Sequence, residues 1–348
     1  MALSMYKHIV RHIAFCLALA LWSGAGCTHR FDGQPNTPVG NVEALWRIID
    51  EKYCFVDEKG VDWESVRAPY VARAQAIPTD ADDAHLQLFD LLAEMVNLLH
   101  DGHVNIYTPF AISSSAAWYE GYPQCYDRDR QRPYLANARY VAGMYYTTFA
   151  QDSIGYIYYP SFQSSFGSGN LYYILSSFKD CKGLILDLRQ NGGGSLEYAY
   201  RLAAMFTTRD TLVGYWQHKN GAAHDAYSRQ EPLYVRAEDS PNKWLRPTVV
   251  LQDRHSYSAT NTFLNAMRYM PNVLLLGGVS GGGGGMPMSY ELPNGWLVRF
   301  STVKMYDAAG KSIEEGIRPH VLDSLVSDQQ DDLIEHALQL IHRVYEKP

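Results

Sequence analysis

Three short segments carry the residue types that acyl transfer needs. They are His100–His103, Asp187–Gly194 and Ser256–Asn261. The first offers a histidine base, the second a glycine-rich turn whose N–H groups could converge on an oxyanion, and the third a serine nucleophile. No single segment is decisive, but together and in this order they predict a serine-hydrolase site.

Ser258 is the predicted nucleophile. It follows the apolar run Val249–Gln252 and precedes a helical pattern that begins near Asn261. A residue at such a strand-to-helix turn projects from the carboxyl end of the strand, and the N–H of Ala259 points the same way, as an oxyanion donor does. The alternative is that Ser258 only caps the helix, because serine and threonine are common N-cap residues.

His103 is the predicted base. It follows Asp-Gly at the end of an amphipathic helix, where the alternative role is an interaction with the C-terminal dipole of that helix. His100 is better placed for that duty because it lies about one turn earlier. The pairing of His103 with Ser258 is therefore the functional hypothesis.

The glycines Gly192–Gly194 follow the apolar strand Leu184–Leu188 and precede a helix. We expect Gly193 and Gly194 to let the backbone approach a ligand; the alternative is a tight turn that needs glycine for its own geometry. A nucleotide site is excluded because no Lys-Ser/Thr follows and the Gly-x-Gly-x-x-Gly spacing is absent. Gly281–Gly285 fails the same test and is interpreted as a flexible rim or substrate-binding loop.

Predicted helices and strands, distinguished by the spacing of their apolar residues, must position these three segments. Residues 41–103 form a predicted helical subdomain, in which one helix runs from Asn41 to about Tyr53 and a longer one starts at a capping-box signature at Thr79. Residues 104–153 are predicted to form loops and a hairpin. From residue 154 to residue 348, strands alternate with helices, and several strands are continuous apolar runs, which indicates an α/β core with buried strands. The predicted core strands are 154–159, 184–188, 249–252, 273–276 and 296–301, and its helices are 196–206, 261–270 and 331–345.

The segments Asp-Gly-His, Leu-Asp-Leu-Arg-Gln-Asn-Gly-Gly-Gly and Ser-Tyr-Ser-Ala-Thr-Asn together resemble the serine peptidases that include the tail-specific (C-terminal processing) proteases and the tricorn core. The resemblance extends to Glu314–Pro319 and covers roughly residues 40–320. It implies a ClpP/crotonase-like α/β core of ββα units behind an N-terminal helical subdomain. Ser258 matches the family nucleophile and His103 the base of the tricorn-like branch. The N–H groups of Gly193 and Ala259 match the oxyanion hole, and Glu314 the acidic group near the site.

The chain departs from the tail-specific proteases in three respects. Their lysine base lies about 25 residues after the serine, but no lysine occurs here between Ser258 and Lys304, so a Ser–His arrangement is favoured. Residues 104–153 are too few for a PDZ domain. Asn261 stands where many relatives carry glutamate, which leaves a contact at the start of the helix open.

The N-terminus predicts export. Lys7 and Arg11 precede the apolar run Ile13–Trp22, which is too short to span a bilayer and fits a signal peptide. Small residues then lead to Cys27, as in a bacterial lipoprotein signal, in which the cysteine is lipidated. The alternative is an ordinary signal peptide cut near Ala25. We therefore expect residues 1–26 to be removed, residues 27–40 to form a tether, and Cys27 to anchor the protein to a membrane of the cell envelope.

Composition narrows the classes of function. The chain has 348 residues and a formal net charge of −7 without a basic patch, so nucleic acid is not an expected partner. Cys54, Cys125 and Cys181 fit no zinc spacing, although one disulfide among them is possible in an oxidising compartment. No metal or organic cofactor is expected.

The resulting hypothesis is an exported serine peptidase that hydrolyses peptide bonds in peptides or unfolded proteins. Two alternatives remain open from the sequence. One is a non-catalytic peptide- or ligand-binding lipoprotein on the same fold, because a fold alone does not establish activity. The other is an acyl hydrolase that acts on a non-peptide ester or thioester.

Overall fold

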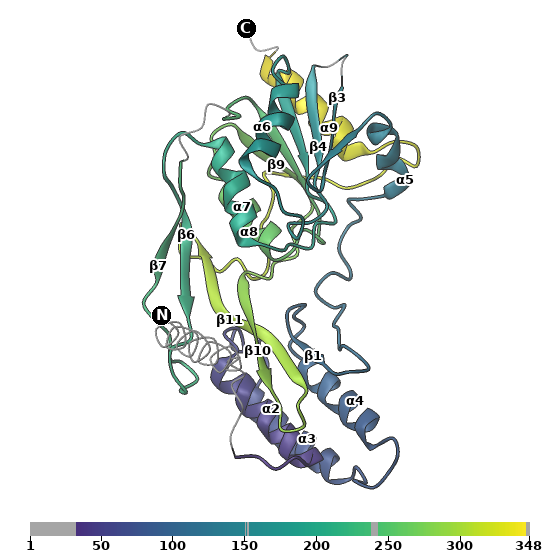
Figure 1. Ribbon diagram of the computed structural model, residues 1–348, viewed down its shortest axis with the longest axis vertical. Coiled ribbons are helices and arrows are strands. Elements are labelled where there is room, and N and C mark those ends of the chain that lie inside the picture. The colour runs from purple at the N-terminus through teal and green to yellow at the C-terminus, as the bar shows by residue number, and fades with distance from the viewer. Residues whose placement is uncertain (1–32, 150, 152, 238–242, 346–348) are drawn as a thin grey trace, which may run out of the picture.

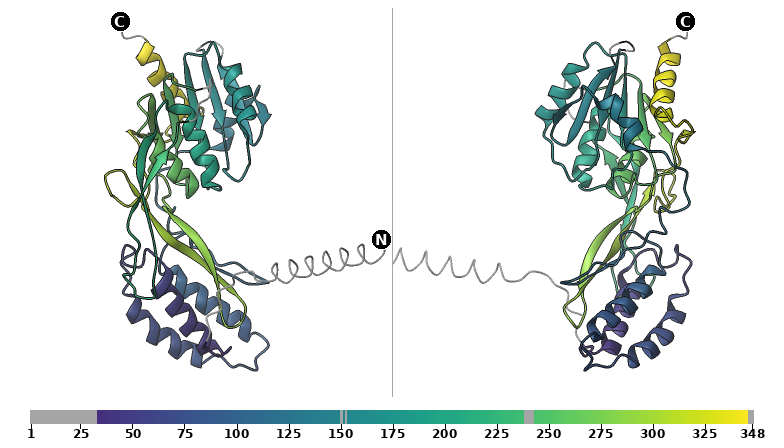
Figure 2. Two further views of the ribbon diagram at one scale, coloured as in Figure 1. Left: turned by 60° about the vertical axis from the view of Figure 1, so that its left-hand side comes forward. Right: turned by 90° about the vertical axis from the view of Figure 1, so that its right-hand side faces the viewer.

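The computed structural model describes residues 33–149, 151, 153–237 and 243–345. An α/β body and a helical body are joined by long strands, which gives the molecule an elongated shape (Figures 1 and 2). The predicted signal peptide and Cys27 lie outside the described residues. Among the described residues, no helix has the length and apolar character needed to cross a bilayer.

The α/β body is built on a mixed sheet in the order β12-β9-β8-β5-β4-β3-β2. Strands β4, β5, β8, β9 and β12 are parallel neighbours, whereas β3 and β2 continue the sheet antiparallel. Both β5 and β8 are buried along their whole length, as their continuous apolar runs predict. The strands of this sheet are β2 (Arg139–Val141), β3 (Met144–Phe149), β4 (Ile154–Tyr158), β5 (Gly183–Asp187), β8 (Thr248–Gln252), β9 (Val273–Gly277) and β12 (Val321–Leu322).

Helices cover both faces of this sheet (Figure 1). Side chains of α6 (Ser168–Ser177), α7 (Leu196–Ala203) and α8 (Ala259–Met267) join one apolar core, which also includes the 3₁₀ turn Ala204–Phe206. Helix α9 (Asp332–Tyr345) packs on β5, β8 and β9 and closes a second core on the opposite face. The predicted α/β fold class is confirmed.

A second sheet, in the order β1-β11-β6-β7 with β10 paired to β11, links the two bodies. Three helices pack against its far end through a separate apolar core. The helices are α2 (Pro38–Lys52), α3 (Trp63–Gln75) and α4 (Ala84–Asn97). The strands are β1 (Asn105–Tyr107), β6 (Thr211–His218), β7 (Glu231–Val235), β10 (Gly285–Glu291) and β11 (Leu297–Asp307).

The structure corrects several predicted boundaries. Helix α2 begins at Pro38, inside the predicted tether, because the Thr37 hydroxyl accepts the N–H of Gly40 and caps it. Helix α4 begins at Ala84 rather than Thr79. The strand pairs β6–β7 and β10–β11 and helix α3 were not predicted. Helix α3 contains Pro69 and has almost no amphipathic pattern, so the sequence gives little signal for it.

The segment predicted to form loops and a hairpin contains β1, the short helices α5 (Arg128–Gln131) and η1 (Arg132–Leu135), and the β2–β3 pair. That pair is the predicted hairpin, and it extends the main sheet rather than standing apart from it.

Candidate active site

Ser258 lies at the N-cap of α8 in a backbone conformation that L residues rarely adopt. Its φ is 58° and its ψ is −121°, and its side chain makes no capping hydrogen bond. The Ser258 N–H donates to the carbonyl of Gly282 over 2.9 Å, which holds the turn in place. Backbone strain of this kind costs on the order of 1–3 kcal/mol and concentrates at functional sites. Ser258 thus occupies the N-cap position of α8 without capping the helix through its side chain.

The hydroxyl of Ser258 instead contacts His103. The Ser258 Oγ lies 3.0 Å from His103 Nε2, although the two residues are 155 positions apart. His103 comes from the turn between α4 and β1, so the pair brings together the helical body and the α/β body. Burial lowers the pKa of His103 to about 4, and the charges of Arg299 and Lys59 act in the same direction. The imidazole is neutral at neutral pH and free to accept a proton.

Asp101 organises the other side of the histidine. Its carboxylate accepts the His103 backbone N–H over 2.7 Å and the hydroxyls of Tyr53 and Tyr257 over 2.7 Å and 3.1 Å. The Tyr257 ring lies 4.7 Å from the imidazole, centroid to centroid. The sequence placed Asp101 and Tyr257 inside the motifs but assigned neither a role.

The other ring nitrogen of His103 faces Ser301. The Ser301 Oγ lies 3.4 Å from His103 Nδ1, and Ser301 is fully buried on β11. No motif pointed to Ser301, because it belongs to an ordinary strand and lies 43 residues after Ser258.

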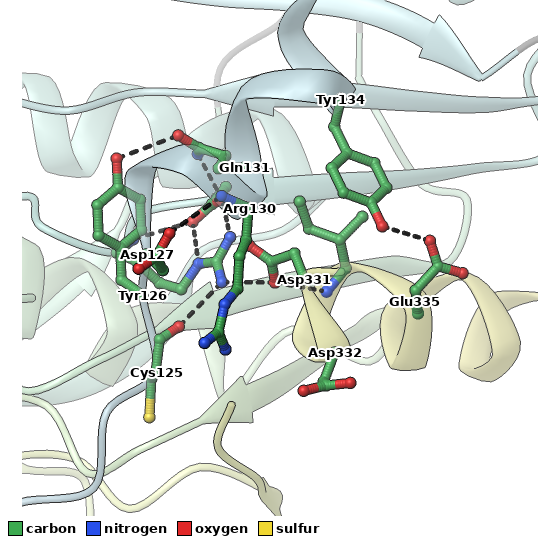
Figure 3. A network of polar contacts seen from close by, with 12 residues as sticks. Cys125, Tyr126, Asp127, Arg130, Gln131, Tyr134, Asp331, Asp332 and Glu335 are labelled. Carbon is green, nitrogen blue, oxygen red and sulfur yellow. Dashed lines mark hydrogen bonds and ion pairs between the residues drawn. The ribbon is translucent and has the colours of Figure 1, made fainter. Parts of the chain in front are cut away.

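The strand that leads to the glycine turn is fixed by Arg189, which is completely buried. Its guanidinium donates to both carboxylate oxygens of Asp187 over 2.9 and 2.6 Å. One terminal nitrogen also donates over 2.9 Å to Asp331 and to the carbonyl of Cys125. Figure 3 shows how Cys125 and Gln131, from the segment that leads into and includes α5, and Asp331, just before α9, converge on this ion pair, where Gln131 donates to Asp187 over 3.0 Å. The arrangement places the turn that follows at the carboxyl end of β5.

Gly193 lies against Ser258. Its φ is 98°, and a Cβ built there would lie 2.8 Å from the Ser258 Cβ and 2.9 Å from the Ala259 nitrogen. The Gly193 N–H, however, donates to Asn191 Oδ1 over 3.0 Å. The Ala259 N–H begins α8, and no hydrogen bond among the described residues uses it. Gly194 is exposed and bridges to Phe162.

Glu314 lies near the pair but does not contact it. One carboxylate oxygen accepts from Lys59 Nζ over 2.8 Å and the other from the Gly284 N–H over 2.9 Å. Burial, together with the Asp101 carboxylate, raises the pKa of Glu314 to about 8. Among the described residues, no hydrogen bond joins Glu314 to His103. The structure therefore brings Ser258 and His103 into contact but not Glu314.

The glycine run Gly281–Gly285 differs from the flexible rim predicted from its composition. All five glycines are buried. The N–H of Gly281 donates to the Ser256 carbonyl and that of Gly283 to the Glu314 carbonyl, so the run forms a packed support beneath Ser258. Asn261 contributes to the same support, because it donates to the Ile313 carbonyl and accepts from the Ser280 hydroxyl.

The described residues hold no group of three or more histidine, cysteine or acidic side chains that could bind a metal. Cys54, Cys125 and Cys181 are all buried free thiols, so the disulfide considered possible from the sequence does not form in this structure.

Comparisons with known proteins give the family. The model of Peptidase family S41 matches residues 153–322, and that of the Tricorn protease C1 domain matches residues 40–97. The crystal structure of a candidate peptidase from Parabacteroides merdae ATCC 43184 is 42% identical to this chain. The match covers 88% of this chain and 97% of that chain, with a TM-score of 0.82. The chain belongs to peptidase family S41. The family resemblance inferred from the motifs is thereby confirmed.

Two further relatives of this S41 chain show how far the likeness extends. It is 31% identical over 144 residues to the carboxy-terminal processing protease CtpA of Bacillus subtilis strain 168, and the match covers 41% of this chain and 29% of that protein. The chain thus spans less than a third of that curated relative. The crystal structure of mature CPAF is 12% identical with a TM-score of 0.67, which shows a shared fold.

Proposed function

We propose that this S41 chain is a serine peptidase in which Ser258 is the nucleophile and His103 the general base. The observation that carries the proposal is the 3.0 Å contact between Ser258 Oγ and a buried, neutral His103. Serine is a weak nucleophile until a base within hydrogen-bond reach takes its proton. A strained serine placed against such a base is costly for the fold, so the arrangement favours catalysis over passive binding.

The chemistry follows the acyl-enzyme route. Ser258 Oγ attacks the peptide carbonyl carbon while its proton passes to His103 Nε2, and the tetrahedral oxyanion collapses as the imidazolium returns the proton to the leaving amine. Water, deprotonated by the same imidazole, then hydrolyses the acyl-serine.

Backbone N–H groups provide the oxyanion donors. The Ala259 N–H is available at the start of α8, and a second donor comes from the Gly192–Gly194 turn. Because the Gly193 N–H is bound to Asn191 in the present state, Gly193 serves only after that bond opens. Loss of one such donor typically costs about 10²–10³ in rate.

The proposed substrates are peptides or unfolded proteins, and the proposed place is the cell envelope. Membership of a peptidase family supports peptides or unfolded proteins as substrates. The N-terminal pattern that ends at Cys27 supports the cell envelope as the place. Export would be tested by the mass of the mature N-terminus purified from membranes, in which lipid on Cys27 is expected and is lost in Cys27→Ala.

The decisive experiment treats the purified mature chain with a fluorophosphonate probe and follows digestion of an unfolded protein by mass spectrometry. Labelling should disappear in Ser258→Ala and fall by at least about 10²-fold in His103→Ala. Matched controls are Ser113→Ala, a buried serine on the helical side, and His85→Ala, an exposed histidine of α4; both should label at the wild-type rate.

Each contrary outcome has a distinct meaning. Labelling that survives in Ser258→Ala removes the nucleophile assignment. A folded wild type that neither labels nor cleaves supports the binding-protein alternative. Hydrolysis of p-nitrophenyl esters without peptide cleavage supports the esterase alternative.

A further inference from the structure

The histidine base has a neutral partner where serine peptidases commonly place a carboxylate. His103 Nε2 faces Ser258 Oγ at 3.0 Å, and Nδ1 faces Ser301 Oγ at 3.4 Å. The nearest carboxylate, Asp101, binds the His103 backbone and not the ring. We propose that Ser301 is a positioning residue, whose hydroxyl holds the His103 ring in the orientation and tautomer that the reaction needs. This inference rests on the proposed function.

The tautomer follows from the two contacts. Nε2 can accept the Ser258 proton only if it carries none of its own, so the single proton of the neutral ring must reside on Nδ1. An Nδ1–H needs an acceptor, and the Ser301 hydroxyl oxygen can supply one. If the ring took the other tautomer, Nε2–H would point at Ser258 and proton transfer from Ser258 would stop. In a serine protease triad, loss of the correct tautomer costs about 10⁴ in kcat.

Ser301 is held too firmly to be an incidental neighbour. Its backbone carbonyl accepts the Cys54 N–H over 3.0 Å, so the strand cannot shift without moving the segment after α2. On the paired strand β10, a Cβ built at Gly285 would lie 2.5 Å from both Cβ and Oγ of Ser301. Glycine is therefore the residue that leaves room for this side chain between β10 and the imidazole.

Because the Ser301 hydroxyl is uncharged, the pKa of His103 is set by other groups. The charges that act on the imidazole are Asp101, which favours the imidazolium, and Arg299 and Lys59, which oppose it. The Tyr257 ring lies beside the imidazole, tilted by 54°. Ser301 adds no net charge to this balance, so it should act on orientation and tautomer and leave the ionisation of the base to the others.

The experiment compares Ser301→Ala with Ser301→Thr, which retains the hydroxyl, and with Ser113→Ala as a matched buried serine whose Oγ accepts a backbone N–H instead. We expect kcat and the rate of fluorophosphonate labelling to fall between about 10- and 10³-fold in Ser301→Ala, with KM changed by less than about twofold. Ser301→Thr should recover at least about half of the lost rate on a logarithmic scale.

Nuclear magnetic resonance of the ¹⁵N-labelled imidazoles reports the tautomer of His103. That tautomer would stay unchanged if Ser301 only stabilised the fold. The wild type should show His103 with its proton on Nδ1, assigned by the signal that His103→Gln lacks. Ser301→Ala should show a mixture of tautomers at an unchanged thermal midpoint.

Two results would overturn the proposal while leaving the proposed function intact. One is a wild type that labels at Ser258 together with a Ser301→Ala that labels equally fast. The other is a folded Ser301→Ala that is slow but keeps the wild-type tautomer. Failure of the wild type to label at Ser258 instead refutes the proposed function itself.

Discussion

Arg189 and Asp331 form an ion pair of 2.9 Å in which both side chains are fully buried. The contact ties the start of α9, at the end of the chain, to the strand that presents the glycine turn. Asp187 pairs with the same guanidinium over 2.6 Å, so a single cation balances two buried carboxylates.

Replacement of Arg189 by methionine should therefore lower the free energy of unfolding substantially. Two carboxylates would remain buried without a cation, and removal of one partner from a buried pair typically costs about 3–5 kcal/mol. Arg189→Lys should recover little, because an ammonium cannot reproduce the planar fork that reaches both acids. Urea unfolding measures the loss.

The matched control is Arg73→Met. Arg73 pairs with Glu94 at 2.6 Å, but half of each side chain is exposed, so its loss should cost less than about 1 kcal/mol. Equal costs for the two arginine variants would show that the buried network does not stabilise the fold.

Gly193→Ala should abolish labelling of Ser258 by the fluorophosphonate probe. The new methyl group would press on the Ser258 side chain and on the backbone nitrogen of Ala259. Gly295→Ala separates this effect from the cost of positive φ, because Gly295 has a φ of +84° but nothing within 4 Å of its would-be Cβ. That control should lose about 1 kcal/mol of stability and no labelling; loss of labelling in both would point to general destabilisation.

The rate of labelling should depend on pH through His103. Because burial lowers the pKa of His103 to about 4, the neutral imidazole should persist down to about pH 5. If His103 is the base, the rate should fall roughly tenfold per pH unit below about pH 4. A rate that is already halved near pH 6.5, the ordinary pKa of histidine, would contradict a buried neutral base.

The same shift has a consequence for folding. Between about pH 6.5 and 4 the unfolded chain binds a proton on this residue and the folded chain does not. The stability contributed by the neutral His103 is therefore present above about pH 6.5 and is lost as the pH falls toward 4. His103→Gln should flatten this part of a plot of unfolding free energy against pH.

His224 should show the opposite dependence. It lies in the connection between β6 and β7 and places one ring nitrogen 2.9 Å from Asp50 and the other 3.0 Å from Asp57. Its hydrogen bond to Asp57 is the main reason that its pKa is raised. The stability it adds is full below about pH 6.5 and disappears as the pH rises through the raised pKa.

Thermal melting of His224→Gln and of the wild type at about pH 5.5 and pH 8.5 checks this prediction. The variant should melt at a lower temperature than the wild type only at the acidic pH. His85→Gln, on an exposed face of α4, serves as the control, and an equal deficit at both values of pH would contradict the protonation argument.

The sequence predicted what depends on local pattern. The apolar run before Asp187 predicted a buried strand and the glycines after it predicted the turn. The alternation of strands and helices predicted the α/β class, and the order of three motifs predicted the family. It also named Ser258 and His103, which the structure brings within hydrogen-bond reach.

The unpredicted features depend on partners distant in sequence. Ser301 faces the histidine only because β1 and β10 pair with β11, and no local spacing records that pairing. Gly281–Gly285 appeared flexible by composition, but tertiary hydrogen bonds to Ser256 and Glu314 bury it. The structure places Gly193 beside Ser258, but the hydrogen bond from the Gly193 N–H to the Asn191 side chain is visible only in three dimensions.

Ser258 and His103 belong to separate bodies of an elongated molecule. The contact between their side chains therefore depends on how the two bodies are aligned. Proton transfer tolerates only a few tenths of an ångström beyond the normal hydrogen-bond length. Under the proposed mechanism, a displacement of the helical body by that much would break the contact between Ser258 and His103 and stop the reaction, and its return would restore both. If the proposed function holds, the alignment of the two bodies would therefore govern the reactivity of Ser258 as directly as the chemistry of His103 does.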